Sequence, residues 1–247
     1  QYGKQWLEGE IFDQIRALAE NGIRFVAASG RQYPNLRRLF APVQDDISYI
    51  AENGSLCIHE GKTLSRGLIP RELGNRIVDA IHRCSGCECI ISGEEVCYSD
   101  SRNEAFRDHM VHVVKNDMRF VDSISEIQEP FLKIAVCNFD GTKDCLAYFQ
   151  ELFSHEIKVV TSGNIWVDFI APGASKGNAL QTLLDHLHIA PEDCVAFGDQ
   201  YNDVEMLQLA GTSYAMSNAA PGISFYSTYV TDSVPEVLDD IISSVGI

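Results

Sequence analysis

The residues best suited to chemistry lie in the stretch 195–207, which reads Val-Ala-Phe-Gly-Asp-Gln-Tyr-Asn-Asp-Val-Glu-Met-Leu. A short apolar run ends at a glycine, Asp199 follows at once, and Asn202 and Asp203 precede apolar residues at helical spacing. This order predicts a strand, an acidic turn and a helix. Ligands of open α/β sheets bind outside the carboxyl ends of the strands, and carboxylate oxygens there favour a hard cation such as Mg²⁺. The alternative is that the aspartates only cap the following helix.

Two other segments carry groups that could bind phosphate. A nearly continuous apolar run at 23–28, typical of a strand covered on both faces, ends in Ser29, Gly30 and Arg31. A hydroxyl and a glycine amide at such a strand end can hold a phosphate oxygen, although an ordinary turn has the same composition. Lys176 stands at the start of a predicted helix, where its charge opposes the helix dipole. This position favours anion binding over an exposed surface lysine.

The elements that must position these residues form an α/β pattern. Helical spacing over 10–21, the apolar run at 23–28, a short strand at 49–51 and a hairpin over 55–64 open the chain. From about residue 68 short antiparallel strands alternate with helices until Pro172 and Gly173. We therefore expect a Rossmann-like, doubly wound parallel sheet core at 1–67 and 172–247, and an inserted α+β cap domain at 68–171.

Composition and charge exclude several classes of protein. Hydrophobic residues make up 45% and charged residues 22%, which is ordinary for a globular domain, and the net charge of −16 disfavours nucleic acid and anionic membranes as partners. We find no membrane-spanning apolar run, no secretion signal and no evident need for an obligate protein partner. A cytoplasmic location is predicted.

The eight cysteines are scattered, which favours reduced thiols over a disulfide framework. Only Cys84, Cys87 and Cys89 have spacing that resembles a metal site. A structural zinc ion would need a fourth ligand, for which the candidates are Cys97, His82 and His109. The alternative is that these thiols are simply buried.

The order of Ser29-Gly30-Arg31, an inserted domain, the segment 172–177 and then 198–203 resembles the haloacid dehalogenase (HAD) superfamily, and more narrowly its Cof-type phosphatases with a large type II cap. The resemblance extends over nearly the whole chain. It implies a Mg²⁺-dependent phosphatase acting on small phosphorylated metabolites, with sugar phosphates as the expected class. The roles implied by position are phosphate binding for Ser29, Gly30, Lys176 and Asn202, metal binding for Asp199 and Asn202, and catalysis for Lys176, Asp199 and Asp203. Arg31 is a candidate for substrate or phosphate binding, and the alternative is that it is an exposed residue at the start of a helix.

One feature of that family is absent from the sequence. Its members begin with a strand ending in Asp-X-Asp-Gly-Thr, whose first aspartate attacks phosphorus, and no such segment precedes Ser29. Because that strand would be the central one of the core sheet, we expect it upstream of Gln1. The similar segment at 138–142 has Asn138 in place of the nucleophile and lies after Ser29, so we interpret it as a turn. A truncated phosphosugar-binding protein without activity and a phosphomutase of the same fold stay open as alternatives.

Overall fold

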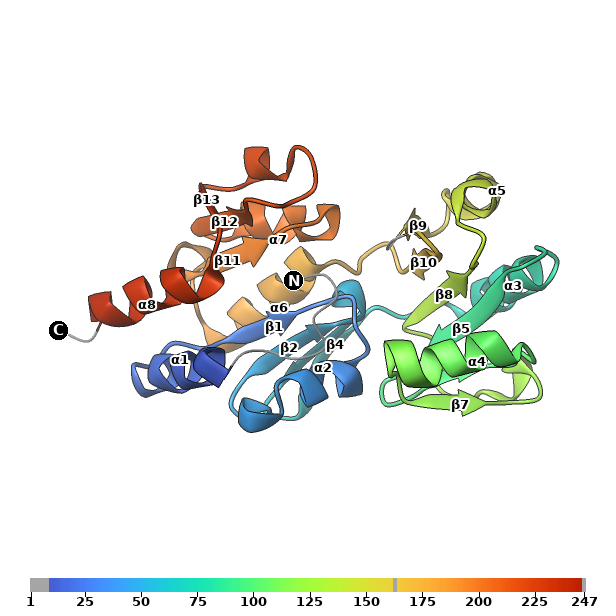
Figure 1. Cartoon of the computed structure of the whole chain (residues 1–247), viewed down its shortest axis with the longest axis horizontal. Helices are drawn as coiled ribbons and strands as arrows, with labels where there is room; N and C mark the ends of the chain where they lie inside the picture. The colour runs from blue at the N-terminus through green and yellow to red at the C-terminus, as the bar shows by residue number, and fades with distance from the viewer. Residues whose placement is uncertain (1–8, 162–163, 246–247) are drawn as a thin grey trace. The chain divides into compact units, whose positions relative to one another are not determined.

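The computed structural model describes residues 9–161 and 164–245 (Figure 1). The chain forms two compact units. The first, called the core unit, holds the residues up to Gly30, Leu36–Ser65 and the residues from Ser175 onward. The second, called the inserted unit, holds Arg31–Asn35 and Arg66–Ala174. The predicted domain boundaries at 67/68 and 171/172 stay a prediction.

The core unit contains two sheets flanked by helices. Its first sheet has the order β1-β2-β3-β4, and its second has the order β11-β12-β13. β1 runs parallel to β2, with Ala28 opposite Ile50, whereas β2 and β3 are antiparallel. The strands are β1 (Val26–Ala28), β2 (Ser48–Ala51), β3 (Leu56–His59), β4 (Lys62–Arg66), β11 (Val195–Gly198), β12 (Thr212–Met216) and β13 (Tyr229–Thr231).

The α/β class is confirmed, and the described strands of the core unit form two sheets. Among the described strands, β1 pairs only with β2 and β11 pairs only with β12, so each of the two has one side without a partner strand. The second sheet is parallel throughout, while the predicted hairpin adds the antiparallel strands β3 and β4 to the first. The polar residues of interest nevertheless follow the carboxyl ends of parallel strands, as expected.

The helices of the core unit are α1 (Gly9–Glu20), α6 (Lys176–Leu187), α7 (Val204–Leu209) and α8 (Val234–Val245), and α2 (Tyr33–Leu39) begins in the short segment assigned to the inserted unit. The leucines of α6 that share one helical face, among them Leu180, Leu183 and Leu184, are buried in a cluster with residues of β2, β3 and α7. Their burial stabilises the helix that carries Lys176 in its first turn.

The inserted unit is built on one six-stranded sheet with the order β7-β6-β5-β8-β10-β9. Alternation along β8 separates its two faces, because Ile134 and Val136 pack with α3 and α5, whereas Ala135 and Cys137 pack with α4. The elements are α3 (Arg71–His82), β5 (Glu88–Ser92), β6 (Cys97–Ser99), α4 (Glu104–Asp108), β7 (Met118–Phe120), β8 (Lys133–Cys137), α5 (Lys143–Phe153), β9 (Lys158–Thr161) and β10 (Trp166–Ile170). The unit therefore has a hydrophobic core of its own.

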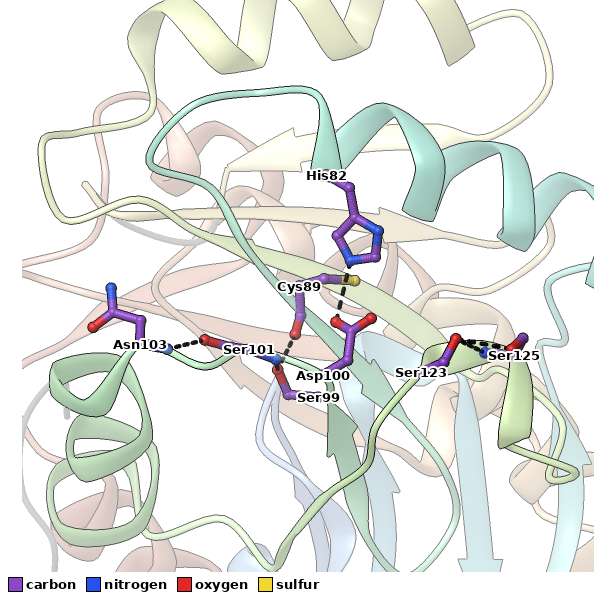
Figure 2. A network of polar contacts seen from close by, with 8 residues as sticks. All are labelled: His82, Cys89, Ser99, Asp100, Ser101, Asn103, Ser123 and Ser125. Atoms are coloured by element: carbon purple, nitrogen blue, oxygen red, sulfur yellow. Dashed lines mark hydrogen bonds and ion pairs between the residues drawn. The ribbon is translucent and has the colours of Figure 1, made fainter.

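A chain of hydrogen bonds fixes the segment that leaves β6 (Figure 2). The hydroxyl of Ser99 donates to the carbonyl oxygen of Cys89 at 2.6 Å, and it accepts from the amide of Ser101 at 3.2 Å. The hydroxyl of Ser101 accepts from the amide of Asn103 at 3.1 Å, and the Asn103 side chain then caps α4. Nε2 of His82 lies 3.1 Å from Oδ1 of Asp100. Short polar side chains thus determine where α4 begins.

No helix in the described part of the chain is both long enough and apolar enough to cross a lipid bilayer.

Candidate active site

The site candidates of the core unit follow three strand ends and one helix start. Ser29 and Gly30 follow β1, the short turn η2 (Glu52–Gly54) follows β2, Asp199 follows β11, and Lys176 opens α6. β1 and β2 are parallel, so their carboxyl ends lie at the same edge of the sheet. The hydroxyl of Ser175 caps α6 by accepting from the amide of Asn178 at 3.1 Å, which fixes where Lys176 leaves the backbone.

The central interaction is an ion pair between Lys176 and Asp203. Nζ of Lys176 lies 2.6 Å from Oδ1 of Asp203, and the two residues are only 6% and 3% exposed. The other carboxylate oxygen of Asp203 accepts from the backbone amides of Asp199 at 2.9 Å and Gln200 at 3.0 Å. One buried carboxylate therefore holds both the lysine and the acidic turn.

These contacts decide between the alternatives that the sequence left open. An exposed lysine at position 176 is excluded, because the side chain is buried and paired. Asp203 does act as a cap, since it closes a capping box with Gln200 ahead of α7, but the same carboxylate also binds Lys176. The same side chain therefore caps this turn and pairs with the buried lysine, and its catalytic role stays a prediction.

Asp199 differs from Asp203 in having an uncommitted carboxylate. Its backbone amide donates to Asp203 and its carbonyl oxygen accepts from Ala220 at 2.8 Å, but within the described residues its half-buried carboxylate makes no hydrogen bond or ion pair. A carboxylate of this kind fits a hard cation, which takes oxygen ligands and keeps several waters. The described residues hold no group of three or more His, Cys, Asp or Glu side chains placed to bind a metal. A cation here would be held by one or two protein oxygens.

Asn202 is joined to a residue that our sequence analysis missed. Its Nδ2 donates to Oδ1 of Asn53 at 2.8 Å, across 149 positions of sequence. Asn53 is only 6% exposed and lies in η2, directly after β2. The available signal was the Glu-Asn-Gly that ends a strand next to β1 in the sheet. This tripeptide was not among the site candidates predicted from the sequence.

Ser29 and Gly30 extend the pairing of β1 with β2. The amide of Ser29 donates to the carbonyl oxygen of Ile50 at 2.8 Å, and the carbonyl oxygen of Ser29 accepts from the amide of Asn53 at 3.1 Å. Arg31 falls in the inserted unit, so the structure groups it apart from Ser29, Gly30, Lys176, Asp199, Asn202 and Asp203. A substrate contact by Arg31 stays a prediction.

The remaining candidates lie in the inserted unit and make structural contacts. All eight cysteines are free thiols, burial raises the pKa of Cys87 and of Cys89, and the described residues hold no group of three or more potential metal ligands. His82, a candidate fourth ligand, contacts Asp100 instead (Figure 2). Asn138 accepts from the amide of Asp140 at 3.0 Å within a turn between β8 and α5, as the sequence predicts. Nothing in these contacts supports zinc binding.

Ser29 and Asp199 follow the carboxyl ends of parallel strands, and the buried Lys176 opens a helix of the same unit. This arrangement, with an α+β insertion, is typical of α/β proteins that bind a ligand at the ends of their strands. Comparison with known proteins identifies the family within that class. A profile of haloacid dehalogenase-like hydrolases matches residues 2–239, and the chain belongs to this family.

Two named phosphatases match this chain over most of its length. The chain is 28% identical over 235 residues to the 5-amino-6-(5-phospho-D-ribitylamino)uracil phosphatase YbjI of Escherichia coli, covering 93% of this chain and 87% of the relative. It is 27% identical over 256 residues to the Bacillus subtilis phosphatase YwtE of the same description, covering 93% and 88%. A crystal structure from Eubacterium rectale superposes with a TM-score of 0.86 at 27% identity, covering 97% and 93% of the two chains.

These findings confirm the predicted family and fold, and they confirm the chain as a phosphatase of this family, a phosphoric monoester hydrolase. The roles predicted for individual residues, the metal and the nucleophile stay predictions.

The contrast between the two aspartates predicts different effects on stability. Asp203→Ala should lower the free energy of unfolding by about 3–5 kcal/mol, because it leaves the Lys176 ammonium buried without its partner. Asp199→Ala removes a carboxylate without a side-chain partner in the described chain and should change stability by about 1 kcal/mol or less. Urea denaturation followed by circular dichroism measures both. Equal losses in the two variants would contradict this account of the site.

Gly54 should be sensitive to substitution because of its surroundings. Its φ is +92°, and a methyl group there would lie 2.1 Å from the carbonyl oxygen of Ser175. Gly54→Ala should cost roughly 3–5 kcal/mol from backbone strain and overlap. Gly61, at φ +70° with no atom within 4 Å of an added methyl group, is the matched control, and Gly61→Ala should cost about 1 kcal/mol. The difference between the two unfolding free energies is the measured quantity, and a difference near zero would show that α6 does not depend on this close contact.

Proposed function

We propose that this chain is a Mg²⁺-dependent phosphatase that hydrolyses phosphate monoesters of small metabolites. The observation that carries the proposal is the carboxylate of Asp203, which holds a buried ammonium on one oxygen and the amides of the Asp199 turn on the other. Asp203 thereby holds both the charged Lys176 and the backbone of Asp199, whose own carboxylate has no side-chain partner among the described residues. That combination suits a phosphoryl group bound together with a cation.

The other residues of the site would bind either Mg²⁺ or the phosphoryl oxygens. Asp199 and Asn202 would hold Mg²⁺, which supplies charge neutralisation for the phosphoryl oxygens. Lys176 would neutralise further charge, and the hydroxyl of Ser29 with the amide of Gly30 would hold another phosphoryl oxygen. Transition states of phosphoryl transfer are loose and rich in negative charge, so catalysis depends on positioning and electrostatics. Burial of Lys176 raises its contribution, because water screens its charge less.

The chemical step needs a nucleophile, which we place on an aspartate upstream of Gln1. Its carboxylate oxygen would bond to phosphorus as the bond from phosphorus to the leaving oxygen breaks, and a second aspartate would protonate that oxygen. Water would then attack phosphorus and release inorganic phosphate and the free carboxylate. Such aspartates need a strand that ends beside the site. The unpartnered sides of β1 and β11 within the described sheets support a further strand there.

The substrate class follows from the relatives and from charge. Both named relatives are phosphatases of a compound with a phosphorylated ribityl chain. We therefore propose sugar phosphates and sugar-alcohol phosphates as the class, in a cytoplasmic setting and without nucleic acid, membrane or an obligate protein partner. With a net charge of −16, the protein must attract a phosphorylated substrate through local groups such as Lys176 and through the metal.

Lys176→Ala tests the proposed role of the lysine. In the full natural chain, turnover of a simple aryl phosphate with Mg²⁺ should fall roughly 10²–10³-fold, because one charge complementary to the transition state is lost. Lys143 is the matched control, since it also opens a helix but is exposed in the inserted unit, and Lys143→Ala should keep full turnover.

Undiminished turnover in Lys176→Ala would overturn the role of the lysine. If the natural chain with Mg²⁺ binds sugar phosphates but releases no phosphate, the protein is a binding protein. If it moves phosphate between positions of one sugar, it is a mutase. Circular dichroism of each variant separates lost chemistry from lost folding.

A further inference from the structure

The turn after β2 has an unusual backbone. Glu52, Asn53 and Gly54 are consecutive residues with left-handed φ values of 50°, 59° and 92°. All three are buried. Non-glycine residues rarely adopt this conformation, and where they do, the surrounding structure must hold them in it. The contacts of the turn show what the conformation achieves.

Asn53 lies between two of the segments already described. A methyl group on Gly30 would lie 2.7 Å from Oδ1 of Asn53, so that glycine is needed for the close approach of the two segments. The same oxygen accepts from Nδ2 of Asn202 at 2.8 Å. The backbone amide of Asn53 donates to the carbonyl oxygen of Ser29 at 3.1 Å. One residue thus contacts both the segment after β1 and the segment after β11.

Gly54 adds a third contact. It lies against the start of α6, where an added methyl group would be 2.1 Å from the carbonyl oxygen of Ser175 and 2.7 Å from the amide nitrogen of Lys176. The turn η2 therefore contacts every segment that carries a site candidate of the core unit: Ser29 with Gly30, Lys176, and Asn202.

The bond to Asn53 also determines the orientation of the Asn202 amide. Nδ2 and Oδ1 of one amide lie in a single plane, so a hydrogen bond that fixes the nitrogen also fixes the direction of the oxygen. Oδ1 of Asn202 accepts no hydrogen bond from any described residue. Asn202 is otherwise exposed, and without the bond its side chain would rotate freely.

We propose that Asn53 is a positioning residue, which fixes the amide of Asn202 so that its oxygen faces the cation. The inference rests on the proposed function, because it assumes that Asn202 contributes to Mg²⁺ binding. Asn53 does not itself touch substrate or metal in this role. It acts as the outer partners of metal ligands do, and loss of such partners typically weakens metal binding 10–100-fold.

The test measures Mg²⁺ binding directly, by isothermal titration calorimetry on the full natural chain, and measures kcat and KM beside it. Asn53→Gly keeps the left-handed backbone and removes the side chain, and its Mg²⁺ affinity should fall roughly 10–100-fold. Asn53→Asp keeps an acceptor oxygen and tolerates the same backbone, so it should restore Mg²⁺ affinity to within about threefold. Glu60→Gly is the matched control, since Glu60 is an exposed residue with φ 49° away from these contacts, and its affinity should not change.

A double variant separates positioning from a general structural role. Asn202→Ala should weaken Mg²⁺ binding to a similar extent, and Asn53→Gly combined with Asn202→Ala should lose little more, because both act through one hydrogen bond. Unchanged affinity in Asn53→Gly, or a double variant that multiplies the two losses, would overturn the proposal. If Asn53→Gly does not fold, Asn53→Ser carries the same expectation, because its shorter side chain does not reach Asn202.

Asp199→Ala distinguishes failure of this inference from failure of the proposed function. If Asp199→Ala keeps its Mg²⁺ affinity, the proposed metal site is wrong and both proposals fall. If Asp199→Ala loses Mg²⁺ binding while Asn53→Gly keeps it, only the role of Asn53 is wrong.

Discussion

The candidate site depends on the buried carboxylate of Asp203. Desolvating a carboxylate and an ammonium is costly, and the cost is offset here by a 2.6 Å contact to Lys176 and by two backbone amides. Because one oxygen of Asp203 binds the start of α6 and the other binds two amides of the turn after β11, the carboxylate aligns these two segments. The position of Asp199, whose amide is one of those donors, follows from the same interaction.

The residues that pack α6 against its neighbours are different from the residue of α6 that belongs to the candidate site. Leucines on one face of α6 pack with β2, β3 and α7. This packing holds the helix in place and so positions Lys176, its first residue. The inserted unit has its own core on both faces of a six-stranded sheet.

Much of the site was predictable because its motifs are local. The strand, acidic turn and helix around Asp199 follow from apolar spacing, and the start of α6 at Lys176 follows from the serine before it. The one-sided pairing of β1 and of β11 agrees with the expectation of a central strand upstream of Gln1, whereas the hydrogen-bond partners of individual side chains come from distant parts of the chain and were not predicted. Arg31 follows Ser29 directly in sequence but belongs to the inserted unit, and its substrate contact stays a prediction.

The sequence by itself determined the family, the α/β class and the residues that could bind phosphate or a cation, because these depend on residue type, spacing and order along the chain. Only the tertiary structure decided which of those groups form hydrogen bonds or ion pairs with one another. Burial of Lys176, the double use of the Asp203 carboxylate and the bond from Asn202 to Asn53 all join segments far apart in sequence. Such contacts depend on how strands and helices pack in three dimensions, and no local pattern encodes the partner of a side chain 149 positions away.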